Sequence, residues 1–539
     1  MQGLMMERPL LVSSILEHAS TIHHDQEVVT RTVEGPVHRY TYADLAQRSR
    51  RLAKALTALG IGRGDRVGTV AWNTHRHLEL YFGVSGMGAV CHTLNPRLHP
   101  EQFAWIVNHA GDRLLFVDAT FVKLVEAVAD KLTTVERVVV MTDRANMPGT
   151  SLPDPLCYED IVEAADDRFA WPALEEGAAA AMCYTSGTTG DPKGVVYSNR
   201  SIVLHAYGLS LPGALPVGER DALLPVVPQF HVLAWGFPYA VPMNGGKLVM
   251  PGPRLDGASL TELMAAEGVT VTAGVPTVWH GLLEHWRTSG ERVPSLGRVV
   301  VGGSAAPRRM IEAFQETYGI AFIHAWGMTE TSPLGTASYL KPADFDAEAS
   351  ARYDRQVKQG RPVFGVEARI VDEGGAPLPR DGVAFGELQV RGPWVCSGYH
   401  RLDVSPGHTA DGWFATGDVA TIDPDGYVQI TDRKKDLIKS GGEWISSIDL
   451  EDLAMSHPDV QQAAVIGVPD PRWEERPLLI VVPVAGAEPD KKAIRAHLGE
   501  RVAKWQVPDD VVFVESLPLG ATGKVLKSRL RETYGGGAA

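Results

Sequence analysis

The eleven residues from Tyr184 to Gly194 combine groups that can wrap the oxygens of a phosphate. They read YTSGTTGDPKG and supply hydroxyls, glycine amides and the ammonium of Lys193. Glycine permits a close backbone approach, hydroxyls and amides donate hydrogen bonds, and the lysine adds charge. Gly187 and Lys193 lack the spacing of the G-x-x-x-x-G-K-[ST] loop, and no Ser or Thr follows the lysine. Composition alone also fits a flexible surface turn.

Four further segments follow in order, and together with this loop they carry a resemblance to a known family. They are HAWGMTET (324 to 331), TGDVATIDPDGY (416 to 427), DRKKDLIKSGGEWISSIDLE (432 to 451) and LPLGATGKVLK (517 to 527). The five segments resemble those of the adenylate-forming superfamily, which holds acyl-CoA synthetases, adenylation domains of peptide synthetases and firefly-type luciferases. The resemblance covers nearly the whole chain and is closest to the medium- and long-chain fatty acyl-CoA synthetase branch.

The resemblance implies a site for ATP and Mg²⁺. The residues implied to hold the β- and γ-phosphates are Thr185, Ser186, Gly187, Thr188, Thr189 and Lys193. Those implied around the adenosine are Gly302, Gly303, Ser304, Trp326, Gly327, Met328, Thr329, Asp418 and Arg433. Glu330, with Thr185, is implied as a magnesium ligand, and oxygen ligands suit that ion. An ionised Asp418 can accept from both ribose hydroxyls, although alone it could simply close a turn.

Lys524 is the implied catalytic lysine. A single lysine near a C-terminus is normally a solvated surface charge, and only the resemblance reverses that interpretation. When a carboxylate attacks the α-phosphorus of ATP, negative charge develops on the phosphate, and an ammonium can orient the attack and stabilise that charge. Pyrophosphate leaves and an acyl-adenylate remains.

The second half-reaction, attack of the coenzyme A thiol on the acyl carbonyl, requires a different active site. The resemblance implies that the C-terminal domain turns at Lys435, so that Lys439, Gly441, Gly442 and Glu443 approach coenzyme A. An exposed basic turn would fit the DRKKD segment equally well.

The clearest sequence indicators of the acyl site are His231 and Trp235, in the segment PQFHVLAWGFP. By resemblance, His231 lies beside the carboxylate and Trp235, with Gly302, beside the acyl tunnel; Trp279 is expected to help shape the pocket. Without the family context, His and Trp in an apolar run are more often core residues. Amino-acid-activating relatives carry Asp where His231 stands, which argues against an amino acid substrate.

The elements that position these groups follow an α/β pattern. Residues 41 to 59 place apolar residues at helical spacing behind a threonine, and DRVGTVAW then predicts a strand. Helix and strand patterns alternate to about residue 150, as in helices layered on a largely parallel sheet. AAAAMCY predicts a buried strand, at which we expect a second sheet to begin. Short β-type segments between 360 and 430 predict a small β subdomain.

We therefore expect an α/β fold with a large N-terminal adenylation domain, a hinge and a C-terminal lid. The N-terminal domain, residues 1–432, comprises two α/β subdomains and a small β-barrel-like subdomain. The hinge is 433–435, and residues 436–539 form a small mobile α+β domain. A chain of 539 residues exceeds one core, which agrees with this division.

Net charge, cysteine spacing and the length of apolar stretches argue against several classes of binding partner. Net charge is −14, from 51 basic and 65 acidic residues, and such a field repels nucleic acid and anionic lipid. Four well-separated cysteines show no zinc spacing, and no stretch has the length of a membrane helix. We expect a cytoplasmic protein, and the resemblance suggests a homodimer.

The sequence favours an ATP-dependent carboxylic acid:CoA ligase acting on a short- to medium-chain fatty or methylthio acid such as 3-methylmercaptopropionate. Long-chain fatty acids remain an alternative, as does loading of a carrier protein, although only fifteen residues follow Lys524. A luciferase-like oxygenase and an inert binding protein on the same fold are further alternatives; the joint presence of Lys193, Glu330, Asp418 and Lys524 argues against the inert protein.

Overall fold

The computed structural model describes residues 1, 3–185, 191–441, 443–520 and 524–536. Ser186, Gly187, Thr188, Thr189 and Gly442, which the resemblance assigns to phosphates and coenzyme A, lie outside the described residues.

The first subdomain is built on a seven-stranded sheet in the order β7-β6-β5-β3-β4-β8-β9. All its pairings are parallel except that between β8 and β9. Its strands are β3 (Arg66–Val70), β4 (Val90–Thr93), β5 (Asp112–Val117), β6 (Arg137–Val140), β7 (Leu156–Cys157), β8 (Ala179–Tyr184) and β9 (Gly194–Ser198). The AAAAMCY strand, β8, therefore does not begin a second sheet as expected. It lies between β4 and the edge strand β9 of the first sheet, so the predicted phosphate loop connects β8 to β9.

Helices connect these strands. They are α2 (Tyr42–Ala58), α3 (His75–Gly86), α4 (Pro100–Ala110), α5 (Val122–Glu126) and α6 (Tyr158–Glu163). The predicted cap of α2 is present: the Thr41 side chain accepts from the Asp44 amide, and Asp44 accepts from the Thr41 amide. The helix and strand expected between 41 and 70 are thus confirmed.

The second subdomain contains a nine-stranded sheet in the order β16-β15-β14-β13-β12-β10-β11-β1-β2. Its strands are β1 (Glu27–Arg31), β2 (Val37–Thr41), β10 (Ala222–Pro225), β11 (Lys247–Met250), β12 (Val271–Gly274), β13 (Arg298–Val301), β14 (Ala321–Gly327), β15 (Leu334–Ala337) and β16 (Arg361–Pro362). Strands β1 and β10 to β14 pair in parallel, with antiparallel strands at both edges. Its helices are α1 (Val12–Ile22), α7 (Asn199–Ser210), α8 (Phe237–Met243), α9 (Gly257–Glu267), α10 (Pro276–Ser289), α11 (Arg308–Glu312), α12 (Pro342–Phe345) and α13 (Ala349–Gln356).

The third unit is a four-stranded antiparallel sheet in the order β17-β18-β19-β20. Its strands are β17 (Glu367–Val371), β18 (Phe385–Arg391), β19 (Phe414–Ile422) and β20 (Val428–Arg433). The pairings run in one line, so the subdomain expected to be barrel-like is an open sheet in the described chain.

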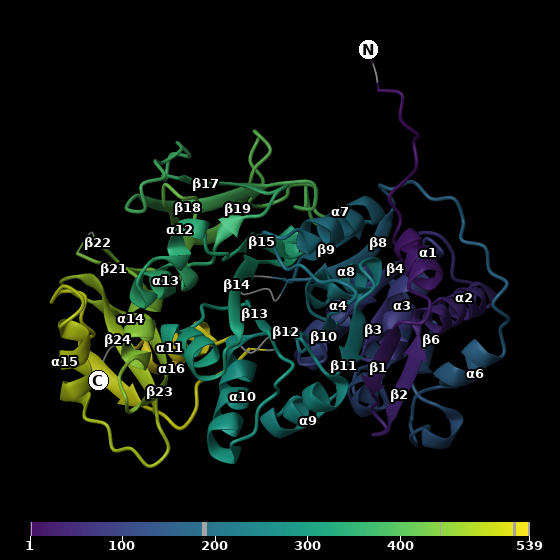
Figure 1. The fold of residues 1–539 in the computed structure, drawn as a ribbon, viewed down its shortest axis with the longest axis horizontal. Coiled ribbons are helices and arrows are strands. Elements are labelled where there is room, and N and C mark those ends of the chain that lie inside the picture. The colour runs from purple at the N-terminus through teal and green to yellow at the C-terminus, as the bar shows by residue number, and fades with distance from the viewer. Residues whose placement is uncertain (2, 186–190, 442, 521–523, 537–539) are drawn as a thin grey trace.

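The C-terminal elements form their own mixed sheet, β22-β21-β24-β23, with β25 parallel to β24. They are β21 (Ile438–Ser440), β22 (Glu443–Ile445), α14 (Ser447–Met455), β23 (Val460–Asp470), β24 (Glu474–Pro483), α15 (Lys491–Gly499), β25 (Asp510–Phe513) and α16 (Lys527–Tyr534). Figure 1 shows these elements at one end of the molecule, with β13 and β14 between them and the N-terminal strands. The predicted fold class, a large N-terminal domain and a small α+β C-terminal domain, is confirmed.

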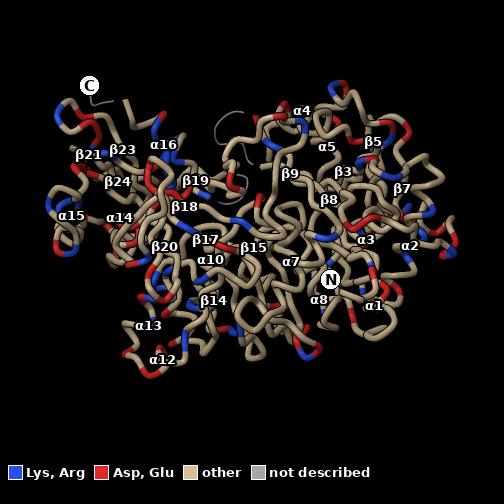
Figure 2. The backbone as a smooth tube through the Cα atoms, turned by 90° about the horizontal axis from the view of Figure 1, so that it is seen from above, with Lys and Arg blue, Asp and Glu red and all other residues tan. Residues whose placement is uncertain are grey.

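Charged residues are spread along the chain. Figure 2 shows acidic and basic residues interspersed along the backbone. No helix of the described chain combines the length and the apolar character that crossing a bilayer requires.

Candidate active site

A cavity of about 1070 Å³ lies where the two large sheets, the β17–β20 sheet and the C-terminal elements meet. An adjoining cavity of about 500 Å³ shares Gly303, Trp326, Gly327, Arg433 and Lys524 with it. The expected residues lining the first cavity are Thr185, Lys193, His231, Trp235, Gly302, Gly303, Trp326, Gly327, Met328, Thr329, Glu330, Arg433, Lys435 and Lys524. Ser304 and Asp418 line the second. Residues more than 300 positions apart thus meet around one continuous space.

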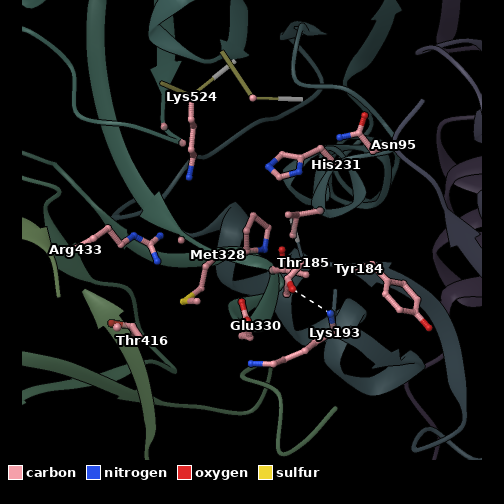
Figure 3. Close-up of a pocket in the computed structure, with 18 of the residues that line it drawn as sticks. Asn95, Tyr184, Thr185, Lys193, His231, Met328, Glu330, Thr416, Arg433 and Lys524 are labelled. Carbon is pink, nitrogen blue, oxygen red and sulfur yellow. Dashed lines mark hydrogen bonds between the residues drawn. The ribbon is translucent and has the colours of Figure 1, made fainter. Parts of the chain in front are cut away.

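Two hydrogen bonds between Thr185 and Lys193 close the base of the predicted phosphate loop at the ends of β8 and β9. The Lys193 amide donates to the Thr185 hydroxyl over 3.2 Å, and the Thr185 amide donates to the Lys193 carbonyl over 2.9 Å. Figure 3 shows Thr185, Lys193 and Glu330 on one side of the cavity and Lys524 entering from the other. The loop is therefore positioned by a buried strand pair.

Glu330 lies on a short 3-10 turn, Thr329–Thr331, and is 6% exposed. The Tyr399 hydroxyl donates to Glu330 Oε1 over 2.8 Å, and the Lys193 ammonium lies 5.3 Å from the centre of the Tyr399 ring. Burial raises the pKa of Glu330, while the Tyr399 hydrogen bond and the charges of Arg433 and Lys193 oppose that rise. Tyr399 lies outside the five motifs, so no sequence pattern predicts this contact.

The described residues contain no group of three or more His, Cys, Asp or Glu that could hold a metal alone. Glu330 and the Thr185 hydroxyl offer oxygen ligands at the same cavity. This sparse donor set fits Mg²⁺, which usually takes one or two carboxylates together with phosphate oxygens and water.

Asp418 lines the second cavity, is 2% exposed and has several hydrogen-bond partners. The Trp326 indole donates to Oδ2 over 3.0 Å, and Arg433 Nε lies 2.7 Å from Oδ1. Asp418 and Arg433 are opposite each other in the β19–β20 pairing, and the Asp418 amide donates to Thr416 Oγ1 over 3.1 Å. Both carboxylate oxygens are thereby oriented, and each retains acceptor capacity for a further donor.

Lys524 projects into the cavity and faces Arg433 and His231 across it (Figure 3). The lysine is open to the cavity, yet surrounding protein removes enough solvation, with a further effect of Arg433, to lower its pKa to about 8. Asp418 and Glu330 act in the opposite direction. At pH 7 the side chain is mostly an ammonium.

His231 lies beside the strained turn that carries Trp235. Burial, and secondarily the charge of Lys524, lower the pKa of His231 to about 4, so its imidazole is neutral at pH 7. Val232 and the three residues after it have φ of 38°, 46°, 49° and 56°, a left-handed run that is costly for side chains with a Cβ. The Trp235 ring packs on Gly302, where a Cβ would lie 3.2 Å from that ring and 2.9 Å from a backbone oxygen. Only glycine fits at 302 with the ring in this place.

Four expected residues are placed away from both cavities. Trp279 is fully buried in a separate core, donates to the Gly274 carbonyl over 3.2 Å and packs against Phe314, so the structure does not bring it to the acyl pocket. Lys439, Gly441 and Glu443 lie on β21, β22 and their turn, and line neither cavity.

Comparison with known proteins places this architecture in one family. The model for the AMP-binding enzyme family matches residues 16–400, and the model for the AMP-binding enzyme C-terminal domain matches residues 449–524. The chain therefore belongs to the AMP-binding enzyme family, as the five motifs predicted. Within that family it is an AMP-forming acid–CoA ligase.

Relatives and solved structures agree over the full length. The chain is 50% identical to a 3-methylmercaptopropionyl-CoA ligase of Ruegeria lacuscaerulensis, over 99% of both chains. It is 48% identical to a medium-chain-fatty-acid–CoA ligase of Ectopseudomonas oleovorans, over 99% of this chain and 98% of that one. ATP-bound MatB from Rhodopseudomonas palustris matches with a TM-score of 0.82 and 27% identity, over 97% of this chain and 99% of that one.

Proposed function

We propose that the chain activates a short- to medium-chain fatty or methylthio acid, with 3-methylmercaptopropionate as the leading candidate, and transfers it to coenzyme A. Two relatives that are 50% and 48% identical to the chain are named as ligases of such acids. One is a 3-methylmercaptopropionyl-CoA ligase and the other a medium-chain-fatty-acid–CoA ligase. The observation that carries the proposal is the convergence of Lys193, Glu330, Asp418, His231 and Lys524 on adjoining cavities.

In the first half-reaction the fixed residues hold ATP. Lys193 and the Thr185 segment bind the β- and γ-phosphates, while the Asp418 carboxylate accepts the ribose hydroxyls. Glu330, with Thr185, holds Mg²⁺, which when bound neutralises phosphate charge. The remaining adenosine contacts are Gly302, Gly303, Ser304, Trp326, Gly327, Met328, Thr329 and Arg433.

The acid enters beside His231 and Trp235. A neutral imidazole avoids placing a second full positive charge beside Lys524 and can donate one hydrogen bond to a carboxylate oxygen. The carboxylate attacks the α-phosphorus, the bond to the bridging oxygen breaks, and pyrophosphate leaves. The Lys524 ammonium contacts the oxygens on which charge develops.

In the second half-reaction the thiol of coenzyme A attacks the acyl carbonyl and AMP leaves. Lys439, Gly441, Gly442 and Glu443 serve this step after the domain 436–539 turns against residues 1–432 at Lys435. The placement of Lys524 inside the cavity, with Lys439, Gly441 and Glu443 outside it, supports the need for such a turn.

The test measures AMP formation with a panel of acids from acetate to palmitate, including methylthio acids, with and without coenzyme A. We expect the highest kcat/KM with acids of short to medium length and turnover that depends on both acid and coenzyme A. A preference for palmitate would favour the long-chain alternative, which a 48% identical long-chain-fatty-acid–CoA ligase of Thermus thermophilus supports. Acid-dependent adenylate formation that coenzyme A leaves unchanged would favour carrier loading.

Two further expectations belong to the same proposal. The buried free thiols Cys91, Cys157 and Cys183 suit a reducing compartment, which supports a cytoplasmic location. We also propose a homodimer, which the mass of the purified protein by light scattering would test; a monomer at micromolar concentration would refute it.

A further inference from the structure

Lys524 is carried by a hairpin whose position depends on the start of α16. The Gly520 amide donates to the Lys524 carbonyl over 2.7 Å, and the Leu526 amide donates to the Pro518 carbonyl over 2.8 Å. Helix α16 begins at the next residue, Lys527. Whatever holds Lys527 therefore also fixes the direction from which Lys524 reaches the cavity.

The side chain of Lys527 is 13% exposed and is held by groups of the C-terminal domain. Its ammonium lies 2.8 Å from Glu451 Oε1, which also accepts from the Val465 amide over 2.7 Å. The ammonium donates a second hydrogen bond to the Ser447 hydroxyl. Because both partners of the ammonium lie on α14, they hold α16 within its own domain.

A third group, Asp432, reaches this cluster from the other side of the hinge. Asp432 lies on β20 and is 1% exposed. Its Oδ2 accepts from the Ser447 amide over 2.7 Å and from the Ser447 hydroxyl over 2.5 Å, at the first turn of α14. A carboxylate is favourable there because the helix N-terminus carries partial positive charge. The Ser447 hydroxyl thus links the Lys527 ammonium to the Asp432 carboxylate.

These contacts join two different sheets. Asp432 belongs to the β17–β20 sheet, whereas Ser447 and Lys527 belong to helices packed on the C-terminal sheet, with residues 433–435 between them. A turn at Lys435 would separate Asp432 from Ser447. The Asp432 carboxylate and the N-terminus of α14 would then lose their hydrogen bonds to each other and need new partners. That loss costs free energy and so opposes the turn.

We propose that Asp432, Ser447 and Lys527 form a contact across the hinge that positions Lys524 for adenylation and opens before thioester formation. The three are positioning residues that act through the Lys524 hairpin: none lines the larger cavity with Lys193 and Glu330, although Asp432 and Lys527 line the adjoining smaller one. This inference rests on the proposed two-step function.

The sharpest variant is Asp432→Asn, because it removes the charge on the hinge side and leaves the Glu451–Lys527 pair intact within the C-terminal domain. The two half-reactions are measured separately in the full chain. Adenylation is followed by acid-dependent exchange of pyrophosphate into ATP, and thioester formation by reaction of a synthetic acyl-adenylate with coenzyme A. We expect kcat of exchange to fall about tenfold, as for a weakened hydrogen bond to a charged group, with an unchanged KM for ATP and an undiminished thioester rate.

Two further variants and a control complete the series. Lys527→Met should show the same split between half-reactions, and Lys527→Arg should recover part of the exchange rate because it retains the charge. Lys492→Met, on the exposed start of α15, is the matched control and should behave as wild type. An equal loss in both half-reactions would reduce the cluster to a structural role, and unchanged exchange in Asp432→Asn would overturn the proposal.

A readout independent of activity keeps the two proposals apart. Arg433, Lys434 and Lys435 are trypsin sites within the hinge; the last two are already exposed, and a weakened contact should loosen the backbone around them. We expect tryptic cleavage at 433–435 to be severalfold faster in Asp432→Asn than in wild type or Lys492→Met. Equal cleavage rates would refute the contact. A wild-type chain without any acid-dependent exchange would refute the proposed function, and the cleavage comparison would still decide the contact.

Discussion

Asp418 and Lys524 both line the smaller of the two cavities, yet the molecule supports them in opposite ways. Asp418 lies within a strand, is 2% exposed, and is oriented by Trp326, Arg433 and Thr416. Lys524 lies on a hairpin of the C-terminal domain, and its only described backbone ties are to that hairpin. In the proposed function, Asp418 binds the nucleotide from within a sheet, whereas Lys524, which acts on the developing charge, is carried by the C-terminal domain.

This difference separates binding from chemistry. A group that contacts the ribose, away from the reacting phosphorus, binds the ground state and the transition state about equally and so sets affinity. A group that arrives on a separate domain can be withdrawn after the first step, which opens the acyl carbonyl to a thiol. Substitutions in the two regions should therefore change different kinetic constants.

Lys524→Ala should have the largest effect. We expect adenylation to slow by about 10²- to 10³-fold, the usual loss when one stabilising donor is removed from a developing anion. Pyrophosphate exchange measures the rate, and calorimetry measures ATP affinity, which should change little. A matched Lys492→Ala variant should leave both unchanged. Loss of ATP affinity in parallel with rate would show that Lys524 belongs to the fixed region.

Asp418→Asn should produce the converse result. Replacing the carboxylate weakens hydrogen bonds to ribose and leaves Arg433 without its partner, so the dissociation constant of ATP should rise about ten- to hundredfold. Calorimetric titration with ATP checks this, and thermal unfolding of the free variant controls for lost stability. Unchanged affinity in a folded variant would remove Asp418 from the nucleotide site.

The pH dependence of adenylation should report the Lys524 ammonium. Since the lowered pKa of about 8 means that the charged form is lost as pH rises through 8, kcat/KM should fall about tenfold between pH 7 and 9. Lys524→Arg, whatever its absolute rate, should shift this fall beyond pH 9 because arginine stays charged. His231, whose pKa is about 4, should add no fall near pH 6.5. A profile that is flat from 7 to 9 would contradict the assignment.

Lys435→Pro should have the smallest and most selective effect. Proline fixes φ and removes an amide donor, which stiffens the segment on which the domain turns. Thioester formation should slow severalfold more than pyrophosphate exchange, as measured by single-turnover reactions. Slowing of both steps to the same degree would place the pivot elsewhere.

The sequence predicted the parts of the site that are contiguous in the chain. The order of motifs gave the family, and the segments around Thr185, Glu330, Asp418 and Lys524 come together on adjoining cavities. The periodicity also placed the helix and strand between residues 41 and 70 correctly, because local pattern decides both.

Features that depend on long-range packing could not be predicted. The strand β8 pairs with β4, which lies almost ninety residues earlier. A local sequence pattern predicts a strand but not its distant partner, so the sheet that β8 joins could not be predicted. Trp279 lies in a hydrophobic core. Its size and apolar neighbours in the sequence fit a core residue and a pocket residue equally well, so the sequence could not distinguish them. The contacts of Tyr399 with Glu330 and of Asp432 with Ser447 join single residues that belong to no spaced pattern.

A crystal structure of the full chain with an ATP analogue and an acid would show whether the cavities bind nucleotide. We expect phosphates against Thr185 and Lys193, ribose hydroxyls on Asp418, and the Lys524 ammonium within hydrogen-bond distance of the α-phosphate and the acid. Nucleotide bound outside these cavities, or bound within them with Lys524 turned away while the acid is in place, would contradict it.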